Sequence, residues 1–507
     1  MLVRAIECVK CGTLIEPGAN FCDQCGTATH SDGCESEWSR GDHTDATRLL
    51  AAGALAKGHV RTWILTWLSE WNRAAPPEVG IDLEFVARVA RFADRRQRRY
   101  DYLFFALAVV AAVGWQFSSP IVMVLAAAAS AGLALFKSLA ECDWLTSYFQ
   151  RDQFSKADID KRFTAVLTQE QSAALAHSNC NLTVYSGFSP FIGAGLEMAG
   201  WSFAIATDKP KTDPSARPLT SFRVQDLYGA VAARLDRLQL PRLEQRDHYF
   251  VHGPDVCEYP SLLPNKYGRP LHALTPELVE RCSYGRDPHV RHYRWIRVSD
   301  WAGDITVSCF LRCYLRGPTL FVEFKRYLLT PLQAAIRQID DLAPARFGQV
   351  VREGLMSVVL GPLKMAGATL EMIRYLTEWS DHVFGFSRRQ RRKMIDRTAR
   401  WNYGAAVSVR QAYASGEYAR YFQLADSDSY QKTLEKEILD SLVDYLDAHG
   451  IDTSDLRDRQ ATILNQGVIV QNGNINAETM AVGQRAQSVQ RKIKKVVQKV
   501  ARAEGAA

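Results

Sequence analysis

Four cysteines near the start of the chain have the residue type and spacing of a metal site. Cys8 and Cys11 form one Cys-x-x-Cys pair, and Cys22 and Cys25 form a second pair after ten intervening residues. Each pair presents two thiolates from one tight turn, and Zn²⁺ favours four such ligands in a tetrahedron. Because four thiolates leave no open position for water, we expect these residues to bind structural zinc and not a catalytic metal.

Residues 7–28, which contain both pairs, resemble the short zinc-ribbon modules found at one end of many bacterial proteins. A glycine follows the second cysteine of each pair, where it relieves strain in the turn. The alternative, four cysteines without a metal, is disfavoured by this spacing. The resemblance implies a small N-terminal module stabilised by zinc.

Length, charge and cysteine usage limit what surrounds this module. The chain has 507 residues, a formal net charge of +7 and 11 cysteines. Since single domains mostly contain roughly 100 to 200 residues, several domains are expected. A charge of +7 over this length does not by itself indicate a nucleic-acid partner. An odd number of cysteines spread along the chain suits a reducing compartment better than a disulfide framework.

An uncharged stretch covers residues 102–136. It is too long for one spanning helix of about 20 residues and long enough for two short ones. Gly114 and the segment "QFSSP" at 116–120 supply turn residues and a proline suited to begin a second helix. We therefore expect a transmembrane helical hairpin over 102–136. Helical spacing of apolar residues predicts a helical juxtamembrane segment over 46–100.

Four arginines at 95–99 predict the orientation of the hairpin, because basic residues favour the cytosolic side. Both soluble parts would then be cytosolic, with two spans in the cytoplasmic (inner) membrane, both termini in the cytosol and the lipid bilayer as a partner. A buried hairpin in a soluble protein and a single bent span are the alternatives. The single span would place the C-terminal part outside the cell, where six cysteines could pair: Cys142, Cys180, Cys257, Cys282, Cys309 and Cys313.

The pattern changes after the hairpin. Residues 150–345 combine strand-like alternation, a helical pattern at 224–238 and a run of three strand-like segments between 292 and 329, which predicts an α+β domain. Residues 346–460 have helical periodicity and predict a helical domain. The expected fold class is therefore multidomain, with an N-terminal zinc ribbon, a transmembrane helical hairpin, an α+β domain, a helical domain and a short β-plus-coiled-coil tail.

The tail comprises a short β segment at 461–485 and a basic amphipathic helix at 486–504. Asn472-Gly473 is a strong hairpin signal, and Val489, Ile493, Val496 and Val500 follow the spacing of a heptad seam. Two heptads are too few to hold a coiled coil alone, so a homo-oligomer through this tail would need help from the β segment or the membrane. The alternative is a solvated basic tail.

A glycine-rich loop at 186–200 is the segment most similar to a ligand site. Gly187, Gly193, Gly195 and Gly200 are candidate ligand-binding residues, because closely spaced glycines let backbone N–H groups approach a phosphate. Neither the phosphate-binding loop of nucleoside triphosphatases nor the dinucleotide spacing is present. The alternative is a structured hairpin loop.

Two further interpretations stay open. If the α+β domain is catalytic, several of His248, His252, His289, Cys257 and Glu197 should converge on one concave site, although no spacing among them imposes geometry, so no catalytic residue is assigned. The basic run "SRRQRRKMIDRTAR" at 387–400 could contact nucleic acid, but for a protein at the bilayer anionic headgroups are the nearer partner, and a solvated helix face is the commonest fate of such a run.

The stretches "LTVYSGFSPFIGAGLEMAGWSFAI", "TLFVEFKRYLL", "YARYFQ" and "ILNQGVIVQNGNINAETMAVG" resemble a group of uncharacterised bacterial membrane proteins over residues 180–485. The resemblance implies the layout and no activity. We expect a membrane-anchored, cytosolic binding, scaffolding or sensing protein, with an unknown protein partner recruited by the ribbon and tail. A membrane-associated enzyme and a membrane-tethered nucleic-acid-binding protein are the alternatives, and binding is favoured over catalysis.

Overall fold

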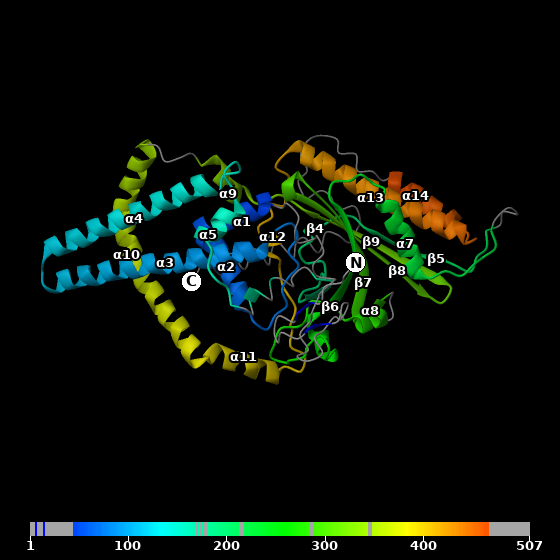
Figure 1. The fold of residues 1–507 in the computed structure, drawn as a ribbon, viewed down its shortest axis with the longest axis horizontal. Helices are drawn as coiled ribbons and strands as arrows, with labels where there is room; N and C mark the ends of the chain where they lie inside the picture. The colour runs from blue at the N-terminus through cyan, green and yellow to red at the C-terminus, as the bar shows by residue number, and fades with distance from the viewer. Residues whose placement is uncertain are drawn as a thin grey trace. The chain divides into compact units, whose positions relative to one another are not determined.

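The computed structural model describes residues 6–7, 14–15, 44–168, 171–172, 175, 180–211, 217–283, 287–342 and 347–465 (Figure 1). The chain divides into two compact units, Met1–Thr453 and Ser454–Ala507. In the second unit the structure describes one helix, α14 (Ser454–Asn465). Residues 461–465 of the β segment predicted at 461–485 belong to α14, and the rest of that segment and the helix predicted at 486–504 lie outside the described residues.

At the N-terminus the described residues form a two-stranded antiparallel pair. Strand β1 (Ile6–Glu7) pairs with β2 (Leu14–Ile15), with Ile6 opposite Ile15 and Glu7 opposite Leu14. The four candidate zinc ligands, Cys8, Cys11, Cys22 and Cys25, lie outside the described residues. The zinc ribbon therefore stays a prediction.

The predicted helical segment at 46–100 corresponds to three helices, α1 (Thr44–Ala56), α2 (Gly58–Ser69) and the first half of α3 (Leu83–Gln116). The side chain of Asp82 accepts a hydrogen bond from the backbone N–H of Phe85 and so caps α3. Their apolar faces pack into one core with the end of α4 (Pro120–Tyr148) and with α5 (Lys156–Arg162). Leu50, Ile64, Phe85 and Phe149 are fully buried there.

The hairpin predicted at 102–136 is present as a pair of packed helices. Helix α3 ends at Gln116, α4 begins at Pro120, and Ser118 turns the chain with a φ of 51°. A Cβ at Gly114 would come within 2.9 Å of the Val122 side chain, so the glycine permits the two helices to approach closely. Because α3 runs without interruption from Leu83, the helix predicted to be juxtamembrane and the first helix of the hairpin are one element.

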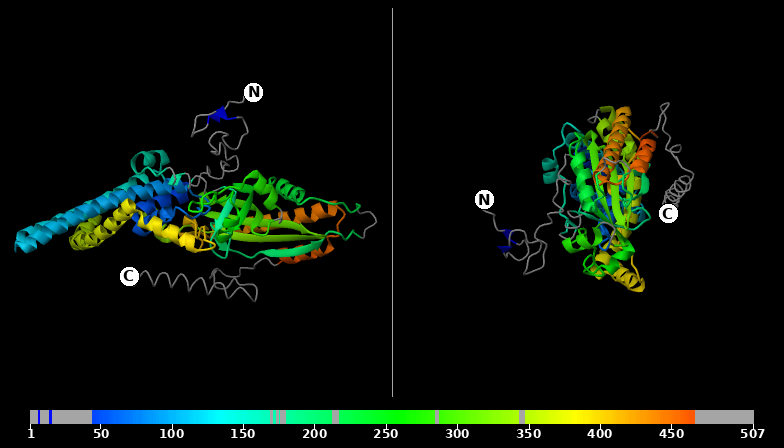
Figure 2. Two further views of the ribbon diagram at one scale, coloured as in Figure 1. Left: turned by 90° about the horizontal axis from the view of Figure 1, so that it is seen from below. Right: turned by 90° about the vertical axis from the view of Figure 1, so that its right-hand side faces the viewer.

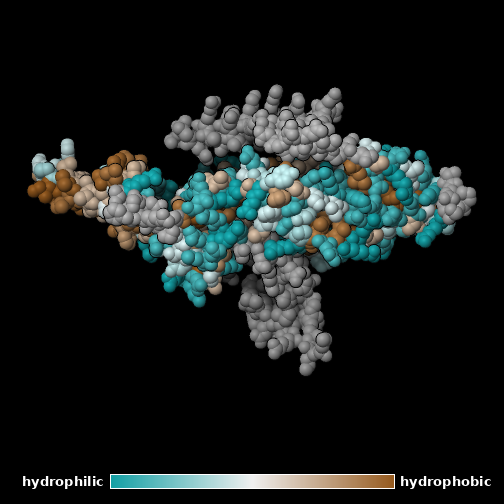
Figure 3. All heavy atoms as spheres, turned by 90° about the horizontal axis from the view of Figure 1, so that it is seen from above, coloured by the Kyte–Doolittle hydropathy of each residue, from teal (hydrophilic) through white to brown (hydrophobic). Residues whose placement is uncertain are grey.

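The end of this hairpin exposes its apolar residues. Phe117 is 78% exposed, and Figure 3 shows hydrophobic side chains gathered at this end. In the alternative of a buried hairpin in a soluble protein, these apolar side chains would be covered by other residues. Their exposure does not favour that alternative. Among the described residues, two helices are long and apolar enough to cross a membrane by length and composition, namely Pro120–Tyr148 in α4 and Arg352–Asp381 in α10 (Phe347–Phe384). The second lies in the segment predicted as a helical domain.

The α+β part contains a mixed sheet of seven strands among the described residues, in the order β3-β6-β7-β8-β9-β4, with β5 also paired to β9. Strands β3 and β6 are parallel and the other neighbours are antiparallel. The strands are β3 (Leu182–Tyr185), β4 (Leu196–Glu197), β5 (Trp201–Ala206), β6 (Leu243–His252), β7 (Val290–Asp300), β8 (Ile305–Arg316) and β9 (Thr319–Leu329).

The sequence predicted β3, β5, β7, β8 and β9, but it missed the two-residue β4, which lies in the predicted glycine-rich loop, and the longer β6. The first half of β6, "LEQRD", carries charged and polar residues in a row and shows no alternation of apolar with polar residues. The pairing of β6 with β7 buries its second half, from His248 to Val251. The strand is therefore decided by tertiary pairing.

Helices from both sides of the predicted boundary at 345/346 complete the α+β part. Helix α13 (Tyr421–Ala448) packs against β8 and α7 (Val224–Leu235), as Figures 1 and 2 show. Arg234 of α7 forms ion pairs with Glu437, Asp440 and Asp444 of α13. The other short elements are η2 (Gly253–Glu258), α8 (Pro276–Cys282), η4 (Trp301–Gly303), α9 (Ala334–Arg337), η5 (Gln338–Asp341), α11 (Phe386–Arg397) and α12 (Val409–Ala412).

Candidate functional site

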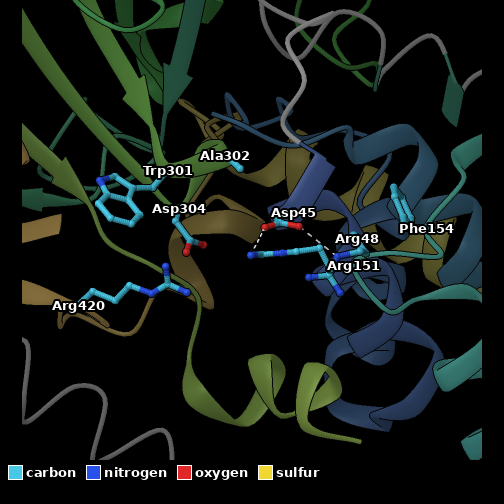
Figure 4. Close-up of a pocket in the computed structure, with 8 residues that line it drawn as sticks. All are labelled: Asp45, Arg48, Arg151, Phe154, Trp301, Ala302, Asp304 and Arg420. Atoms are coloured by element: carbon cyan, nitrogen blue, oxygen red, sulfur yellow. Dashed lines mark hydrogen bonds and ion pairs between the residues drawn. The ribbon is translucent and has the colours of Figure 1, made fainter. Parts of the chain in front are cut away.

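A polar cavity of about 520 Å³ lies where α1, the segment after α4, the β7–β8 connection and the start of α13 meet (Figure 4). This volume is within the usual range for small-molecule sites, roughly 300 to 1,000 Å³. Its lining residues are Asp45, Arg48, Arg151, Phe154, Trp301, Ala302, Asp304 and Arg420. The cavity therefore joins the helical part to the α+β part within the first unit.

The connection between β7 and β8 forms one wall and has an unusual backbone. Trp301, Ala302 and Gly303 have φ values of 55°, 54° and 84°, and the first two are not glycines. The left-handed region costs a non-glycine residue about 1 to 2 kcal/mol, so the surrounding structure must hold this turn in place. Strained turns of this kind concentrate at ligand sites, which makes this wall a candidate binding surface.

Three hydrogen bonds hold the strained turn. The side chain of Asp300 accepts a bond of 2.6 Å from the backbone N–H of Trp301. The Tyr430 hydroxyl donates to the other oxygen of Asp300 at 2.5 Å, and the indole N–H of Trp301 donates to Asp426 at 2.9 Å. Helix α13 therefore fixes both the backbone and the ring of the turn.

The opposite wall is built on Arg48 of α1, whose side chain is only 1% exposed. Its guanidinium donates to both carboxylate oxygens of Asp340, at 2.5 and 2.9 Å, and to the carbonyl of Phe149 at 2.7 Å. Its Nε donates to Asp45 at 3.2 Å. With all of its nitrogens engaged, Arg48 positions this wall and keeps Asp45 in place.

Two more arginines face the cavity with accessible side chains. Arg151 forms an ion pair with Asp45 and is still 59% exposed. The guanidinium carbon of Arg420 lies 5.7 Å from the centre of the Trp301 ring, within the range of a cation–π contact. Figure 4 shows Arg48 and Arg151 on either side of Asp45, with Trp301, Asp304 and Arg420 across from them.

Asp304 is a partly buried carboxylate of the cavity. One of its oxygens is buried with no hydrogen-bond partner, and the other accepts a long bond of 3.5 Å from Gln423. Burial raises the pKa of Asp304, because desolvation penalises its charged form. A buried polar atom without a partner is uncommon in native proteins and is explained if a ligand supplies the missing hydrogen bond.

A second charged layer lies beneath Asp304. Arg410 donates through Nη2 to the backbone carbonyls of Asp304 and Thr330, at 3.0 and 2.8 Å, and burial lowers the pKa of Arg410 to about 10. Glu78 is fully buried and accepts bonds from the backbone N–H groups of Val409 and Arg410 and from the Ser408 hydroxyl. Burial raises the pKa of Glu78 to about 7.

The lining has three arginines, Arg48, Arg151 and Arg420, against two carboxylates, Asp45 and Asp304. Burial raises the pKa of Asp304, which disfavours its charged form beside these arginines. Phe154 and Trp301 add apolar surface to the lining. The arrangement therefore fits a small anion with a planar or apolar part, which Arg151 and Arg420 would contact.

The glycine-rich loop packs against its own chain at three of the four predicted positions. A Cβ at Gly193, Gly195 or Gly200 would lie 2.4, 2.2 or 2.5 Å from a backbone carbonyl oxygen of Pro77, Leu328 or Phe324, respectively. Gly193 and Gly195 also have positive φ, whereas Gly187 has open space around it. Close packing thus accounts for three of these glycines, and their predicted ligand role stays a prediction.

The residues proposed for catalysis do not form one concave site. His248 is buried on β6 and contacts Thr183 at 2.8 Å, whereas Glu197 on β4 forms an ion pair with Lys325, with β7, β8 and β9 between their strands. His289 lies beside Asp255 and Glu258, at 3.3 and 3.4 Å. His252 and Cys257 lie at the start of and within η2, the same turn that His289 contacts, so these three residues share one region and His248 and Glu197 lie outside it.

No group of three or more His, Cys, Asp or Glu side chains in the described part of the chain is arranged to hold a metal ion. The predicted zinc ligands are outside that part. Of the six cysteines named for the single-span alternative, Cys142, Cys257, Cys282, Cys309 and Cys313 are free thiols, whereas Cys180 is disulfide-bonded.

The cavity was not predicted from the sequence. The segment "DWAGD" at 300–304 indicates only a divider between two strands. The local feature of this segment that could have indicated a site is an acidic residue on each side of the Trp-Ala-Gly turn. Arg48, Arg151 and Arg420 come from three distant segments, so their spacing along the chain carries no signal at all.

Comparison with known proteins adds one match. A family model described as an AbeC-like domain matches residues 200–477, which is more than half of the 507-residue chain. The matched region begins just before β5, includes the Trp301–Asp304 wall and Arg420, and leaves out the α3–α4 hairpin. No curated protein and no solved structure was found to match the chain. The chain belongs to the family of proteins with an AbeC-like domain.

Proposed function

We propose that this chain is a membrane-anchored sensing protein that binds a small anion in the cavity beside the Trp301–Gly303 turn. The observation that carries the proposal is the cavity lined by three arginines and a strained turn, in which the partnerless oxygen of Asp304 would accept a hydrogen bond from an N–H or O–H of the same ligand. Preformed strain and an unsatisfied buried atom are features that a bound ligand would compensate.

Anchoring would come from the α3–α4 hairpin. Its exposed apolar end supports insertion, and the charged residues at its base support a boundary with water. Both ends of the hairpin would lie on the cytosolic side of the inner membrane, as the arginines at 95–99 predict. A reporter fused after residue 507 tests this orientation, and reporter activity confined to the outer side would contradict it.

The remaining parts would connect the sensor to partners. A zinc ribbon at 7–28 would present a small rigid surface to a protein partner, and the C-terminal segment would support a homo-oligomer. In this scheme the cavity lies between the elements that contact the hairpin and the sheet. Occupancy by the anion could then change how the two parts pack, which is what a sensor requires.

The test uses the purified full-length chain in detergent or lipid nanodiscs and a fixed panel of anions: inorganic phosphate, pyrophosphate, AMP and GMP. Calorimetry and thermal unfolding report binding. Arg420→Gln and Arg151→Gln should each weaken the best binder by about 10- to 100-fold, since a hydrogen bond to a charged group contributes about 1.5 to 3 kcal/mol.

The matched control is Arg223→Gln on the exposed start of α7, where Arg223 pairs with Asp226. This variant removes the same charge and leaves the cavity unchanged. Equal loss in all three variants would indicate a general charge effect. Absence of binding by the whole panel, or wild-type affinity in both cavity variants, would contradict the proposed ligand class.

A further inference from the structure

Helix α10 has a composition that allows two placements in a membrane protein. The segment Arg352–Asp381 is long and apolar enough to cross a bilayer, but it contains seven charged side chains: Arg352, Glu353, Lys364, Glu371, Arg374, Glu378 and Asp381. Each charge at the bilayer centre is costly. The alternative is a helix that lies in the interface, with one apolar face and one charged face.

Contacts along α10 show that it crosses the α3–α4 hairpin and does not run beside it. A Cβ at Gly361 would lie 2.6 Å from the backbone nitrogen of Ala131 on α4. Further along α10, Tyr375 donates to Asp101 of α3 at 2.5 Å. The helix therefore passes from α4 to α3 over its length, and Figure 1 shows the crossing.

A small apolar cluster marks the crossing point. Phe104 of α3, Ala134 of α4, and Met365 and Ala368 of α10 are buried together. All four lie near the base of the hairpin, since the turn between α3 and α4 is at 117–119. If the hairpin enters the bilayer with its exposed end first, its long axis follows the direction of insertion. Helix α10 then crosses this axis near the base of the hairpin.

The charged side of α10 faces the base of the hairpin. Glu378 accepts a hydrogen bond of 2.7 Å from Arg98, which precedes the apolar part of α3. Glu353 accepts a bond of 2.8 Å from Ser138, which follows the apolar part of α4. Glu353 and Glu378 thus lie in one layer with the polar residues that bound the hairpin, and not with its apolar end.

The apolar side of α10 is exposed. Leu355, Val359, Leu363, Leu370 and Ile373 are exposed, and Leu355 and Leu370 reach 74% and 70%. Their separations of four, four, seven and three residues place them along one face of a helix. This face and the exposed end of the hairpin both present apolar side chains. A lipid environment would cover both.

We propose that α10 lies parallel to the bilayer plane, in the boundary between headgroups and acyl chains, and does not cross the membrane. The proposal rests on the anchoring by the hairpin proposed above. The occupant of the exposed apolar face is a phospholipid bilayer with anionic headgroups. The basic helix α11, which follows Gly385 directly, would continue along the same surface and supply the positive charge.

Depth measurements on the full-length chain separate an interfacial helix from a span. An environment-sensitive fluorescent amino acid replaces one residue at a time on the apolar face (Val359, Leu363, Leu370 and Ile373), on the charged strip (Lys364 and Glu371) and at the hairpin end (Val113). The protein is reconstituted into phosphatidylcholine–phosphatidylglycerol vesicles. Nitroxide lipids labelled near the headgroup or near the chain end report depth, and aqueous iodide reports exposure to water.

The expected result has helical periodicity. All four apolar-face labels should be quenched equally by the shallow nitroxide, both charged-strip labels by iodide, and the Val113 label by the deep nitroxide. Depth that increases and then decreases steadily along α10 would show a span and overturn the proposal. Quenching at Val113 without any lipid quenching on α10 would also overturn it, because another surface would then cover the face.

The Val113 label keeps the two proposals distinguishable. If neither Val113 nor α10 is quenched by lipid, the hairpin does not anchor the chain, and both the anchoring and the interfacial helix are wrong. If Val113 is quenched and α10 gives the wrong pattern, the anchoring stands and only the interfacial helix fails.

Discussion

Arg410 donates from Nη2 to the backbone carbonyl of Asp304 at 3.0 Å, and so joins helix α12 to the strained turn that forms one wall of the cavity. The contact links residues 106 positions apart. Below it, Glu78 accepts a bond of 3.1 Å from the backbone N–H of Arg410. Two buried ionisable groups, Arg410 and Glu78, therefore support the cavity wall. Stability should depend on pH, and stability and anion binding should depend on the strain in the turn.

The pH dependence of Glu78 gives the first prediction. Burial raises the pKa of Glu78 from 4.5 to about 7, so between these values the folded chain holds a proton that the unfolded chain has lost. The contribution is fully present below pH 4.5 and is lost as the pH rises through 7. Relative to Glu78→Gln, the free energy of unfolding of the wild type should fall by on the order of 3 kcal/mol across this window.

Chemical denaturation of both proteins at a series of pH values measures this difference. The glutamine side chain does not titrate but keeps a hydrogen-bond acceptor. Any loss of stability from altered hydrogen bonds is the same at every pH, so it does not affect how the difference in unfolding free energy changes with pH. Parallel curves for the two proteins would contradict the raised pKa of Glu78.

Strain at Ala302 gives the second prediction. Ala302→Gly removes the penalty of a left-handed non-glycine residue, so the chain should keep its stability or gain up to about 1 kcal/mol. Binding of the small anion should weaken severalfold, because the turn is no longer held rigid before binding. Thermal unfolding and calorimetry on one preparation measure both effects.

The control for Ala302→Gly is Ala233→Gly on the exposed face of α7. There the same substitution should destabilise the chain by about 1 kcal/mol without altering anion binding, since glycine is unfavourable inside a helix. Similar losses of stability at both positions would show that the turn carries no strain.

The glycine-rich loop gives the third prediction. Gly195→Ala should destabilise the chain by more than about 2 kcal/mol, because a Cβ would come within 2.2 Å of the Leu328 carbonyl at a φ of +97°. Gly187→Ala, with nothing within 4 Å, should be nearly neutral. Midpoints of urea unfolding compare the two. An anion-binding defect in a stable Gly187→Ala protein would support the ligand role predicted for this loop.

Charge on α11 gives the fourth prediction. Replacing the exposed residues Arg388, Arg389 and Lys393 by Gln should weaken binding to anionic vesicles by about 1 kcal/mol per residue, with a shallower salt dependence. Vesicle flotation at several salt concentrations measures this. The matched control replaces Lys161, Lys432 and Lys436 on α5 and α13 by Gln. An equal effect in the control would show that total charge alone determines binding.

Zinc content gives the fifth prediction. The full-length chain should contain one Zn²⁺, and Cys8→Ser or Cys22→Ser should lower its affinity sharply, because each removes one of four thiolates. Elemental analysis after dialysis measures the metal. Anion binding in the cavity should persist in both variants, which separates the ribbon from the sensor. Wild-type zinc content in both variants would contradict the predicted ligand set.

Parts of the fold could be predicted because their residues carry a local signal. The turn at 117–119 follows from Gly114 and Pro120, and β7, β8 and β9 follow from their alternation and dividing turns. Strand β6 and the position of α10 could not be predicted. Strand β6 is positioned by its pairing with β7. Helix α10 is positioned by contacts such as that between Arg98 and Glu378, which are 280 residues apart.

The sequence by itself determined the local elements of this protein: apolar runs, turns and cysteine spacing fix which segments become helices, hairpins and candidate zinc ligands, because these depend on neighbours within a few residues. Only the tertiary structure decided the cavity and the placement of α10. Arg48, Arg151, Trp301 and Arg420 are brought together from distant segments. Burial at this junction raises the pKa of Asp304, a property that no single stretch of the chain contains.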